Sequence, residues 1–221
     1  VDYTLFTFGT IVGDPLANIS IVPPTDSPYT DLIDFGTTTL VLTATTVELH
    51  LTGTDAAVWG DGVAADWSTP ANWVAAVAPS TTVAAVVDSS TNSVPNLAAL
   101  GDAHTLIIDN ASATIGTGGN LTVANKTHVM NGGTLTVAAG GVLSSNGDTT
   151  VYTGGALDVQ ASMILADDKN INTSGTTTFG AASSLTLSAA TGGAGNLNIN
   201  GGTTTIANGA SITANAINAN G

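Results

Sequence analysis

The sequence predicts an all-β fold, in which a small N-terminal β module and a Trp-containing cap precede a right-handed parallel β-solenoid, or β-helix. Short triplets of apolar and Thr residues recur about every seven residues from position 105 to 221, separated by Gly, Asn, Ser and Ala. Such short strands, each followed by a turn, are typical of stacked solenoid coils. Straight-chain helix formers are scarce: charged residues make up 8% of the chain, Arg is absent and Glu48 is the lone Glu. This composition favours strands and turns over helices.

Residues 1–53 are predicted to form a β module of their own. Val47, Leu49 and Leu51 alternate with polar residues, which is the pattern of a half-buried strand. A Pro-rich stretch at residues 22–28 excludes a central strand there. We therefore expect a small separate β module that contains a Pro-rich loop and precedes the main repeat.

Residues 54–104 are predicted to form the cap and the first coil. All three Trp residues of the chain lie within fifteen positions, at Trp59, Trp67 and Trp73. Large rings just before a solenoid suit a plug that covers its first coil. The alternative interpretation is that exposed Trp faces make a platform that stacks on the sugar rings of a glycan.

The same segment carries a resemblance to a known family. Trp59-Gly60-Asp61-Gly62 is followed by Asp66-Trp67-Ser68-Thr69-Pro70-Ala71-Asn72-Trp73, then Pro79, an apolar strand ending in Asp88, and a Gly/Asn/Thr-rich repeat. This order resembles the β-helical passenger regions of bacterial autotransporter-type and related large surface proteins. The resemblance covers roughly residues 58–221 and implies that the Asn-Trp segment opens a right-handed β-helix. One departure is that Ala75-Ala76 stands where the family often has a Gly pair.

Residues 105–221 are predicted to form the solenoid repeats. A three-sided coil requires equivalent strands about 20–22 residues apart, and the sequence suggests one such series: Thr122, Val142, Ile164, Thr186 and Thr205. A two-strand coil near 14 residues fits only the beginning of the repeat. We expect roughly five to six three-sided coils, with a loop insertion at residues 189–195.

Glycine and asparagine mark the predicted turns. Five Gly pairs suit turns that need a positive φ, and Asn side chains at turns can form ladders between coils. The Gly pairs are Gly118-Gly119, Gly132-Gly133, Gly140-Gly141, Gly154-Gly155 and Gly201-Gly202, and the ladder candidates are Asn131, Asn146 and Asn208.

The charge of the chain limits its partners. The net charge is −14, and residues 1–110 hold twelve of the sixteen acids with neither Lys nor Arg. Such a surface repels nucleic acid and anionic membranes. No run of 18 apolar residues exists, so we expect no direct membrane insertion in this segment. The absence of Cys excludes disulfides, and the low pI fits an extracellular location at a bacterial cell surface.

Candidate chemical groups are few. Asp167 and Asp168 are the only adjacent acids, and paired carboxylates are the groups with which many polysaccharide-cleaving β-helices work; the alternative is a solvated turn. Asp61, Asp66 and Asp88 are weak calcium candidates because Ca²⁺ prefers oxygen donors. The three His residues are far apart in sequence. We predict no catalytic residue and no cofactor apart from this calcium hypothesis.

These observations predict a non-enzymatic extracellular structural protein of a bacterial surface. It is expected to act as a fibre-forming subunit or an adhesin stalk, assembling head-to-tail through its solenoid ends or binding other surface components. The alternative is a polysaccharide-binding or polysaccharide-cleaving β-helix. A third interpretation makes these residues a passive spacer in a longer passenger protein.

Overall fold

The computed structural model describes residues 2–7, 39–42, 46–50, 55–60, 66–88, 95–188 and 193–220. The chain divides into two compact units, Val1–Asp55 and Ala56–Gly221. This division lies two residues from the predicted boundary at 53/54.

The N-terminal unit contains a three-stranded antiparallel sheet with the order β1-β3-β2. Its strands are β1 (Asp2–Thr7), β2 (Thr39–Leu42) and β3 (Thr46–His50). β3 contains Val47 and Leu49 of the predicted alternating strand, while Leu51 lies outside the described residues. β1 has a register shift between Thr4 and Phe6 where it pairs with β3.

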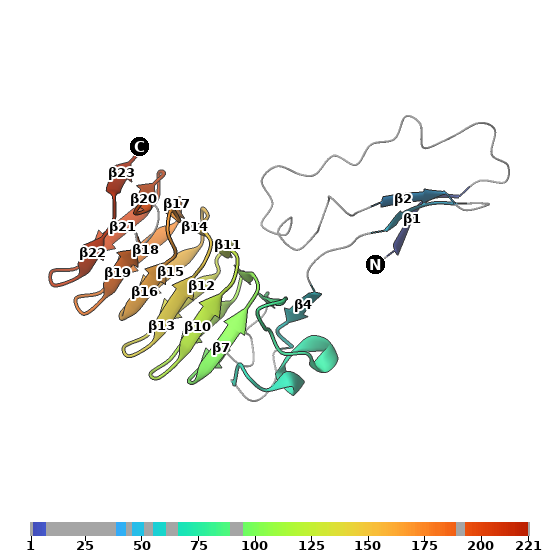
Figure 1. Ribbon diagram of the computed structural model, residues 1–221, viewed down its shortest axis with the longest axis horizontal. Helices are drawn as coiled ribbons and strands as arrows, with labels where there is room; N and C mark the ends of the chain where they lie inside the picture. The colour runs from blue at the N-terminus through green and yellow to red at the C-terminus, as the bar shows by residue number, and fades with distance from the viewer. Residues whose placement is uncertain are drawn as a thin grey trace. The chain divides into compact units, whose positions relative to one another are not determined.

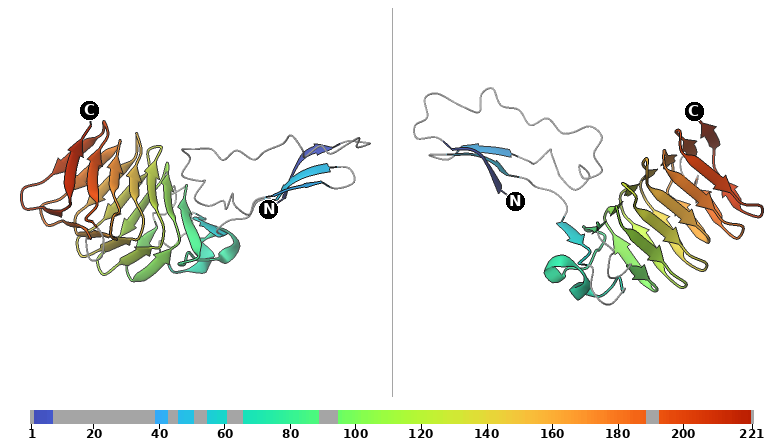
Figure 2. Two further views of the ribbon diagram at one scale, coloured as in Figure 1. Left: turned by 45° about the horizontal axis from the view of Figure 1, so that its top comes forward. Right: turned by 180° about the vertical axis from the view of Figure 1, so that it is seen from behind.

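The second unit is a parallel β-solenoid of three sheets, which confirms the predicted fold (Figures 1 and 2). Sheet 1 consists of β4 (Asp55–Val58), β5 (Val83–Val87), β8 (Leu106–Asp109), β11 (Thr127–Met130), β14 (Thr149–Val151), β17 (Ile171–Thr173), β20 (Asn196–Ile199) and β23 (Ala216–Ala219). Sheet 2 consists of β6 (Asn96–Leu97), β9 (Ser112–Ile115), β12 (Thr134–Val137), β15 (Ala156–Val159), β18 (Thr176–Phe179) and β21 (Thr203–Ile206). Sheet 3 consists of β7 (Leu100–Ala103), β10 (Asn120–Val123), β13 (Val142–Ser145), β16 (Ser162–Leu165), β19 (Ser184–Leu187) and β22 (Ser211–Thr213).

The chain visits sheets 1, 2 and 3 in that order, so β5, β6 and β7 form the first turn. Six turns are complete, and β23 begins a seventh. Two short 3₁₀ helices, η2 (Pro70–Asn72) and η3 (Val74–Ala76), lie between β4 and β5. The predicted segment 54–104 therefore holds β4, both helices and the whole first turn.

The register of the sheets corrects two of the predicted equivalences. Thr122 pairs with Ser144, Ser144 with Ile164, and Ile164 with Thr186. Val142 was wrong by two positions because it pairs with Asn120. Thr205 was wrong because it lies in sheet 2, opposite Thr178.

Paired residues in most turns lie 20–22 positions apart, as predicted. The exceptions are the pair β6 and β9, where Asn96 pairs with Thr114, 18 positions on, and the turn that contains residues 189–192, where Ile171 pairs with Leu197, 26 positions on. Part of the predicted insertion at 189–195 lies outside the described residues. The extra residues leave the ladder itself intact, since β17 and β20 remain paired on either side of them.

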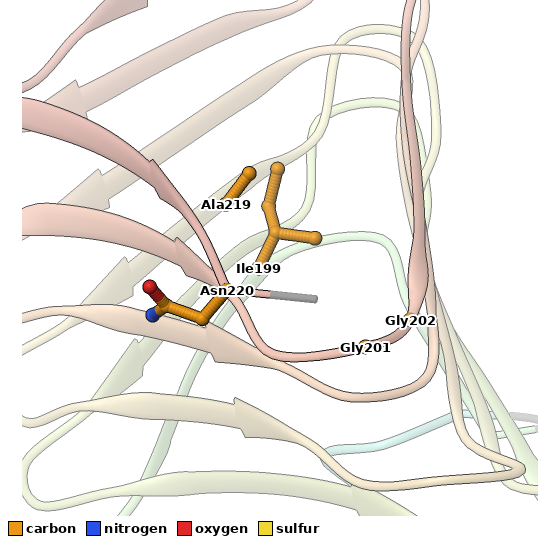
Figure 3. A pocket seen from close by; sticks show the side chains of 5 residues that line it. All are labelled: Ile199, Gly201, Gly202, Ala219 and Asn220. Carbon is orange, nitrogen blue, oxygen red and sulfur yellow. The ribbon is translucent and has the colours of Figure 1, made fainter.

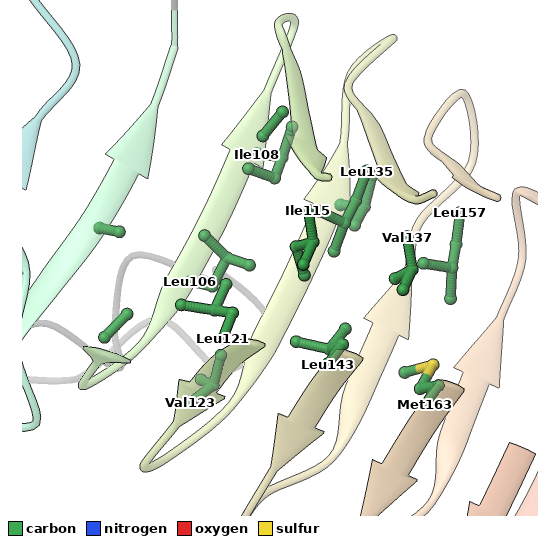
Figure 4. Packing of buried hydrophobic residues seen from close by; sticks show 14 of the residues in the cluster. Leu106, Ile108, Ile115, Leu121, Val123, Leu135, Val137, Leu143, Leu157 and Met163 are labelled. Atoms are coloured by element: carbon green, nitrogen blue, oxygen red, sulfur yellow. The ribbon is translucent and has the colours of Figure 1, made fainter. Parts of the chain in front are cut away.

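The core is a stack of matching inward positions. Leu121, Leu143, Met163 and Leu185 occupy one column of sheet 3, and each is at most 1% exposed. Figure 4 shows such side chains from several turns packed in the interior. Each turn alone buries only a few apolar side chains, so stacking between turns supplies the rest of the burial.

The first strands of sheet 1 are buried on both faces. Val86, Ile107 and His128 stand in one outward column, yet each is buried. Their strands carry near-continuous apolar runs, such as Val83–Val87, which is the composition expected when both faces are covered.

The Gly pairs have two different roles. The first Gly of all five pairs has a positive φ, between +79° and +88°. The second faces the previous turn: a Cβ on Gly133 would lie 2.5 Å from the carbonyl oxygen of Ile108. The first Gly therefore allows the turn, and the second allows two backbones to approach closely.

Side-chain ladders connect the turns in part as predicted. Asn131 Nδ2 donates to Asp109 Oδ1 in the preceding turn at 2.8 Å. The longest Asn ladder uses residues that the sequence analysis did not select. Asn198 donates to Asn172 at 2.8 Å, and Asn218 donates to Asn198 at 2.9 Å.

Candidate functional site

The three Trp residues form one packed cluster at the start of the solenoid. The ring of Trp73 lies edge-to-face with Trp59 and with Trp67, at centroid distances of 5.0 Å and interplanar angles of 84° and 81°. Trp73 Nε1 donates to the carbonyl oxygen of Trp67 at 2.8 Å. The cluster is continuous with the apolar core that includes Leu97.

The Trp rings are buried and cannot stack on a sugar in this conformation. Trp59 is 2% exposed, and Trp67 and Trp73 are each 3% exposed. A carbohydrate platform requires an accessible ring face, and these three rings present none in this structure. Their position over the first turn fits the plug instead.

A turn centred on Asp66 holds the cluster in place. The carboxylate of Asp66 accepts hydrogen bonds from the backbone N–H of Ser68 at 3.0 Å, the Thr69 hydroxyl at 2.8 Å and the Ser68 hydroxyl at 2.9 Å. These bonds, led by the Ser68 N–H and then Thr69, lower the pKa of Asp66. The carbonyl oxygen of Asp66 accepts from Asn72 Nδ2 at 2.7 Å, which connects the turn to the segment before Trp73.

The cap also covers two of the three sheet edges at this end. β4 is the outermost strand of sheet 1, and the Trp59 N–H donates to Val86 in β5 at 2.8 Å. Asp66 forms a parallel bridge with Asn96, the first residue of β6 in sheet 2. Among the described strands, none pairs with the outer edge of β7 in sheet 3.

Only two of the three calcium candidates, Asp66 and Asp88, lie within the described residues. Asp61 lies outside the described residues, and both carboxylate oxygens of Asp66 already accept hydrogen bonds from its own turn. Asp88 is exposed at the end of β5. No group of three or more His, Cys, Asp or Glu residues that could hold a metal occurs within the described ranges. A calcium site that includes Asp61 stays a prediction.

The adjacent acids Asp167 and Asp168 lie in the turn between β16 and β17. Asp168 has a positive φ of 60°. Its Oδ1 accepts from the Gly193 N–H at 2.8 Å, and its own N–H donates to the Gly193 carbonyl at 3.0 Å. Asp168 therefore connects its own turn to the loop at Gly193 in the next turn through two hydrogen bonds.

The described His residues also lie apart. His104 Nδ1 is 3.2 Å from Thr105 Oγ1. His128 Nδ1 is 3.2 Å from the Tyr152 hydroxyl, and the two rings stack with centroids 5.9 Å apart. The side chain of His50 lies outside what the structure describes.

The C-terminal end of the described solenoid differs from its first turn. β21, β22 and β23 are the last strands of their sheets, and none of the described strands pairs with their outer edges. We call these three strands the open end. One turn earlier, Phe179 and Leu197 are fully buried, but their successors in the core columns, Ile206 and Ile217, are 45% and 51% exposed.

A shallow pocket of about 340 Å³ lies at the same end (Figure 3). It is lined by Ile199, Gly201, Gly202, Ala219 and Asn220. Apolar side chains and two glycines with bare backbone make up most of this lining, so the pocket offers no ionisable group.

The open end is also uncharged. No Asp, Glu, Lys, Arg or His occurs between Asn170 and Gly221, although the chain as a whole carries a net charge of −14. This absence is the sequence signal that could have identified the surface before the structure was known.

The described part of the chain has no helix that is both long and apolar enough to cross a membrane.

Comparisons with known proteins found no match. No protein-family model, no curated protein and no solved structure matches the sequence or the fold of this chain.

Proposed function

We propose that this chain is a non-enzymatic structural protein of a bacterial surface, and that it acts as a subunit of an extracellular fibre. The observation that carries the proposal is the solenoid itself: six stacked turns joined by parallel strand ladders, with buried Trp rings over the first turn. A ladder of this kind can be extended by further turns or by strands of another chain.

The distribution of exposed apolar residues supports association through the ends. Six large apolar residues are exposed in the described part of the chain, and five of them lie beside or within the first or the last turn: Val74, Val77, Leu100, Ile206 and Ile217. The sides of the solenoid instead present Thr, Ser, Asn and Asp. A contact at either end, whether with a further turn or with another copy, would bury these side chains.

The proposed assembly is head-to-tail. A contact between different surfaces of identical subunits continues without closing and gives open filaments. The N-terminal unit of one copy would cover the open end of the next. An adhesin stalk is the related role, in which the same rod presents a binding surface at a distance from the cell.

The extracellular location at a bacterial surface belongs to the same proposal. It is supported by the resemblance of the Trp-rich segment to autotransporter-type passenger regions, by the absence of Cys and by the strongly acidic composition. Other surface components are proposed as further partners, and nucleic acid is not, because the charge of the chain would repel it.

Electron microscopy of the purified chain, with and without Ca²⁺, tests this function. Regular filaments with an axial repeat near one subunit length are expected. A strictly monodisperse monomer at high protein concentration would contradict the fibre. Isolated short rods that bind sugars on a glycan array would instead favour the polysaccharide-binding alternative.

A further inference from the structure

The outward face of sheet 2 carries a regular array of threonine. In each strand from β9 to β21, two outward residues flank one inward residue, as Thr134 and Thr136 flank the buried Leu135. Adjacent strands pair without a register shift, so the outward residues form two straight columns along the solenoid. We call these ten positions the Thr columns: Ser112, Thr134, Ala156, Thr176 and Thr203 in one, and Thr114, Thr136, Asp158, Thr178 and Thr205 in the other.

Threonine is concentrated on this face of the solenoid. Seven of the ten positions in the Thr columns are Thr. The corresponding outward positions of sheet 3, from β10 to β22, hold only three, at Thr122, Thr186 and Thr213. Strand propensity favours Thr equally on both faces, so it does not account for this difference. Sheet 2 therefore combines a hydroxyl and a methyl group at repeated positions for another reason.

The Thr columns are accessible and nearly uncharged. All ten residues are half-buried or exposed, and Asp158 is the one charged residue in the described strands of sheet 2. Gln160 Nε2 donates to Asp158 Oδ1 at 2.5 Å, so this carboxylate is already engaged. Thr114, Thr136 and Thr178 lie in strands that are paired along both edges. Their exposure is therefore a property of the side of the solenoid and does not depend on where the solenoid ends.

The array has two fixed repeats. Neighbouring strands lie roughly 4.8 Å apart, and the two outward residues of one strand lie about 6.6 Å apart. The branched Cβ of Thr restricts its χ1 angle, so each side chain presents its hydroxyl and methyl group in few orientations. The Thr columns are thus a two-dimensional lattice of hydroxyl and methyl groups on a rigid backbone.

A ligand that contacts all of this lattice must itself be a lattice. The oxygen atoms on a prism face of hexagonal ice repeat along two perpendicular directions, at intervals comparable with those of the Thr columns. A Thr hydroxyl both donates to and accepts from water, and its methyl group orders the water beside it. Ice accommodates ions poorly, so a face that binds ice must also be nearly neutral.

From these observations we propose that the Thr columns are an ice-binding surface, whose ligand is crystalline water. Water held by the hydroxyl groups would join the crystal, and many weak contacts made at once would hold the protein on the ice face. Ala156 and Asp158 interrupt both columns in a single turn. This binding site does not depend on the fibre function proposed above.

A charge placed in the Thr columns tests the site. The gap between the melting and freezing temperatures of a single ice crystal is measured in solutions of the full chain, together with the shape of the crystal. Wild type is expected to open such a gap and to give faceted crystals, and Thr136→Lys is expected to lose both effects. Thr122→Lys is the matched control and is expected to retain them, because Thr122 is an equally half-buried outward residue of sheet 3.

Three results would overturn the proposal. The first is a wild-type chain in which ice grows as smooth discs at every undercooling. The second is an effect on ice that survives in Thr136→Lys, and the third is a loss as large in Thr122→Lys as in Thr136→Lys. Circular dichroism of each variant separates loss of binding from loss of fold.

Completing the array gives a test that misfolding cannot imitate. The double variant Ala156→Thr and Asp158→Thr makes both columns continuous over five turns, and it is expected to widen the gap beyond that of wild type. A folded double variant with no wider gap would show that the lattice of Thr side chains is not what binds.

Crystalline cellulose serves as the second probe, because a regular face could also bind a crystalline polysaccharide. Wild type is expected to remain in the supernatant when cellulose is sedimented. Sedimentation with cellulose, without any effect on ice crystals, would overturn the proposal and favour the polysaccharide-binding alternative.

Discussion

At the scale of single residues, the solenoid depends on positions where a side chain has no room. The second Gly of each pair faces a carbonyl oxygen of the preceding turn, while the first Gly supplies only a positive φ. Two adjacent glycines therefore tolerate substitution differently. This difference follows from the short distance between stacked turns, and local turn propensities do not predict that distance.

Replacing Gly133 by Ala is expected to destabilise the chain more than replacing Gly132 by Asn. The Ala Cβ would lie 2.5 Å from the Ile108 oxygen and 2.8 Å from the Met130 oxygen, so two turns must separate. Gly132 has a φ of +87°, which Asn adopts more readily than most residues, and its nearest neighbour is 3.5 Å away. Urea unfolding should give a loss above about 1 kcal/mol for Gly133→Ala and a smaller one for Gly132→Asn. Equal losses would contradict the division of roles.

Thr149 offers the opposite change, a substitution that should stabilise. It is fully buried in sheet 1, and its hydroxyl has no hydrogen-bond partner in the structure. A buried unsatisfied hydroxyl costs about 1–3 kcal/mol, and Val has nearly the same shape. Thr149→Val is expected to raise the free energy of unfolding by about 1 kcal/mol. A lower midpoint for the variant in urea would show that the hydroxyl is satisfied after all.

The sequence predicts residue roles well where they depend on local conformation. The first Gly of each pair was expected to have a positive φ, and all five do. The ladder from Asn172 to Asn218 was not expected, because it depends on which outward positions of different turns fall in register. The sequence shows where Asn is frequent but not which residues face each other.

At the scale of elements, the turn that begins at Asp66 organises the cap. The Asp66 carboxylate accepts hydrogen bonds from the Ser68 N–H and from the Ser68 and Thr69 hydroxyls, and the Asp66 carbonyl oxygen accepts one from Asn72 Nδ2. The segment between Trp67 and Trp73 is thereby fixed, so that the Trp73 ring lies against both other Trp rings. The motif Asp-Trp-Ser-Thr-Pro-Ala-Asn-Trp thus folds as one unit that places the Trp rings against one another.

The stabilising effect of Asp66 is expected to depend on pH. Its pKa is lowered in the folded state, so its contribution is present above the unfolded value of about 3.9 and is lost as the pH falls through the folded pKa. Asp66→Asn should therefore lower the urea midpoint at about pH 6, and the difference from wild type should shrink by about pH 2.5. A difference that is constant across this range would exclude the carboxylate charge as the cause.

The elements themselves were predicted more accurately than their register. Three strands to a turn and a spacing of 20–22 residues are confirmed, but Val142 and Thr205 were assigned to the wrong positions. Triplet patterns repeat with nearly equal spacing in all three sheets, so a shift of two residues keeps the same inward face. The insertion before β20 then moved Thr205 into another sheet.

At the scale of the whole molecule, charge and apolar exposure separate along the chain. Twelve acids lie in residues 1–110, and none lies after Asp168. In the proposed filament, neighbouring copies would bring their acidic segments close together. Their mutual repulsion opposes assembly, and salt screens it.

Raising the salt concentration is therefore expected to strengthen association. The Debye length falls from about 30 Å at 0.01 M to about 8 Å at 0.15 M, so repulsion between neighbouring subunits weakens. Light scattering at fixed protein concentration should rise over this range in wild type. Weaker scattering at higher salt would show that ion pairs, not strand edges and apolar contacts, hold the subunits together.

The open end shows the limit of prediction from sequence at this scale. An unpaired last coil was expected from the solenoid pattern, but the side chains it exposes depend on which sheet each strand joins. Ile206 and Ile217 look like any other inward Ile in the repeat. Only the position of their strands at the ends of sheets 2 and 1 makes them accessible.

The parallel register between turns also determines how the rod bears tension. Its ladder hydrogen bonds run along the solenoid axis, so an axial pull loads them one layer at a time rather than all together. Most turns that peel away release 20–22 residues, or about 70 Å of extended chain at roughly 3.3 Å per residue, and the turn with the insertion releases more. The molecule would lengthen in a series of small steps and dissipate force gradually before the covalent chain carries the load.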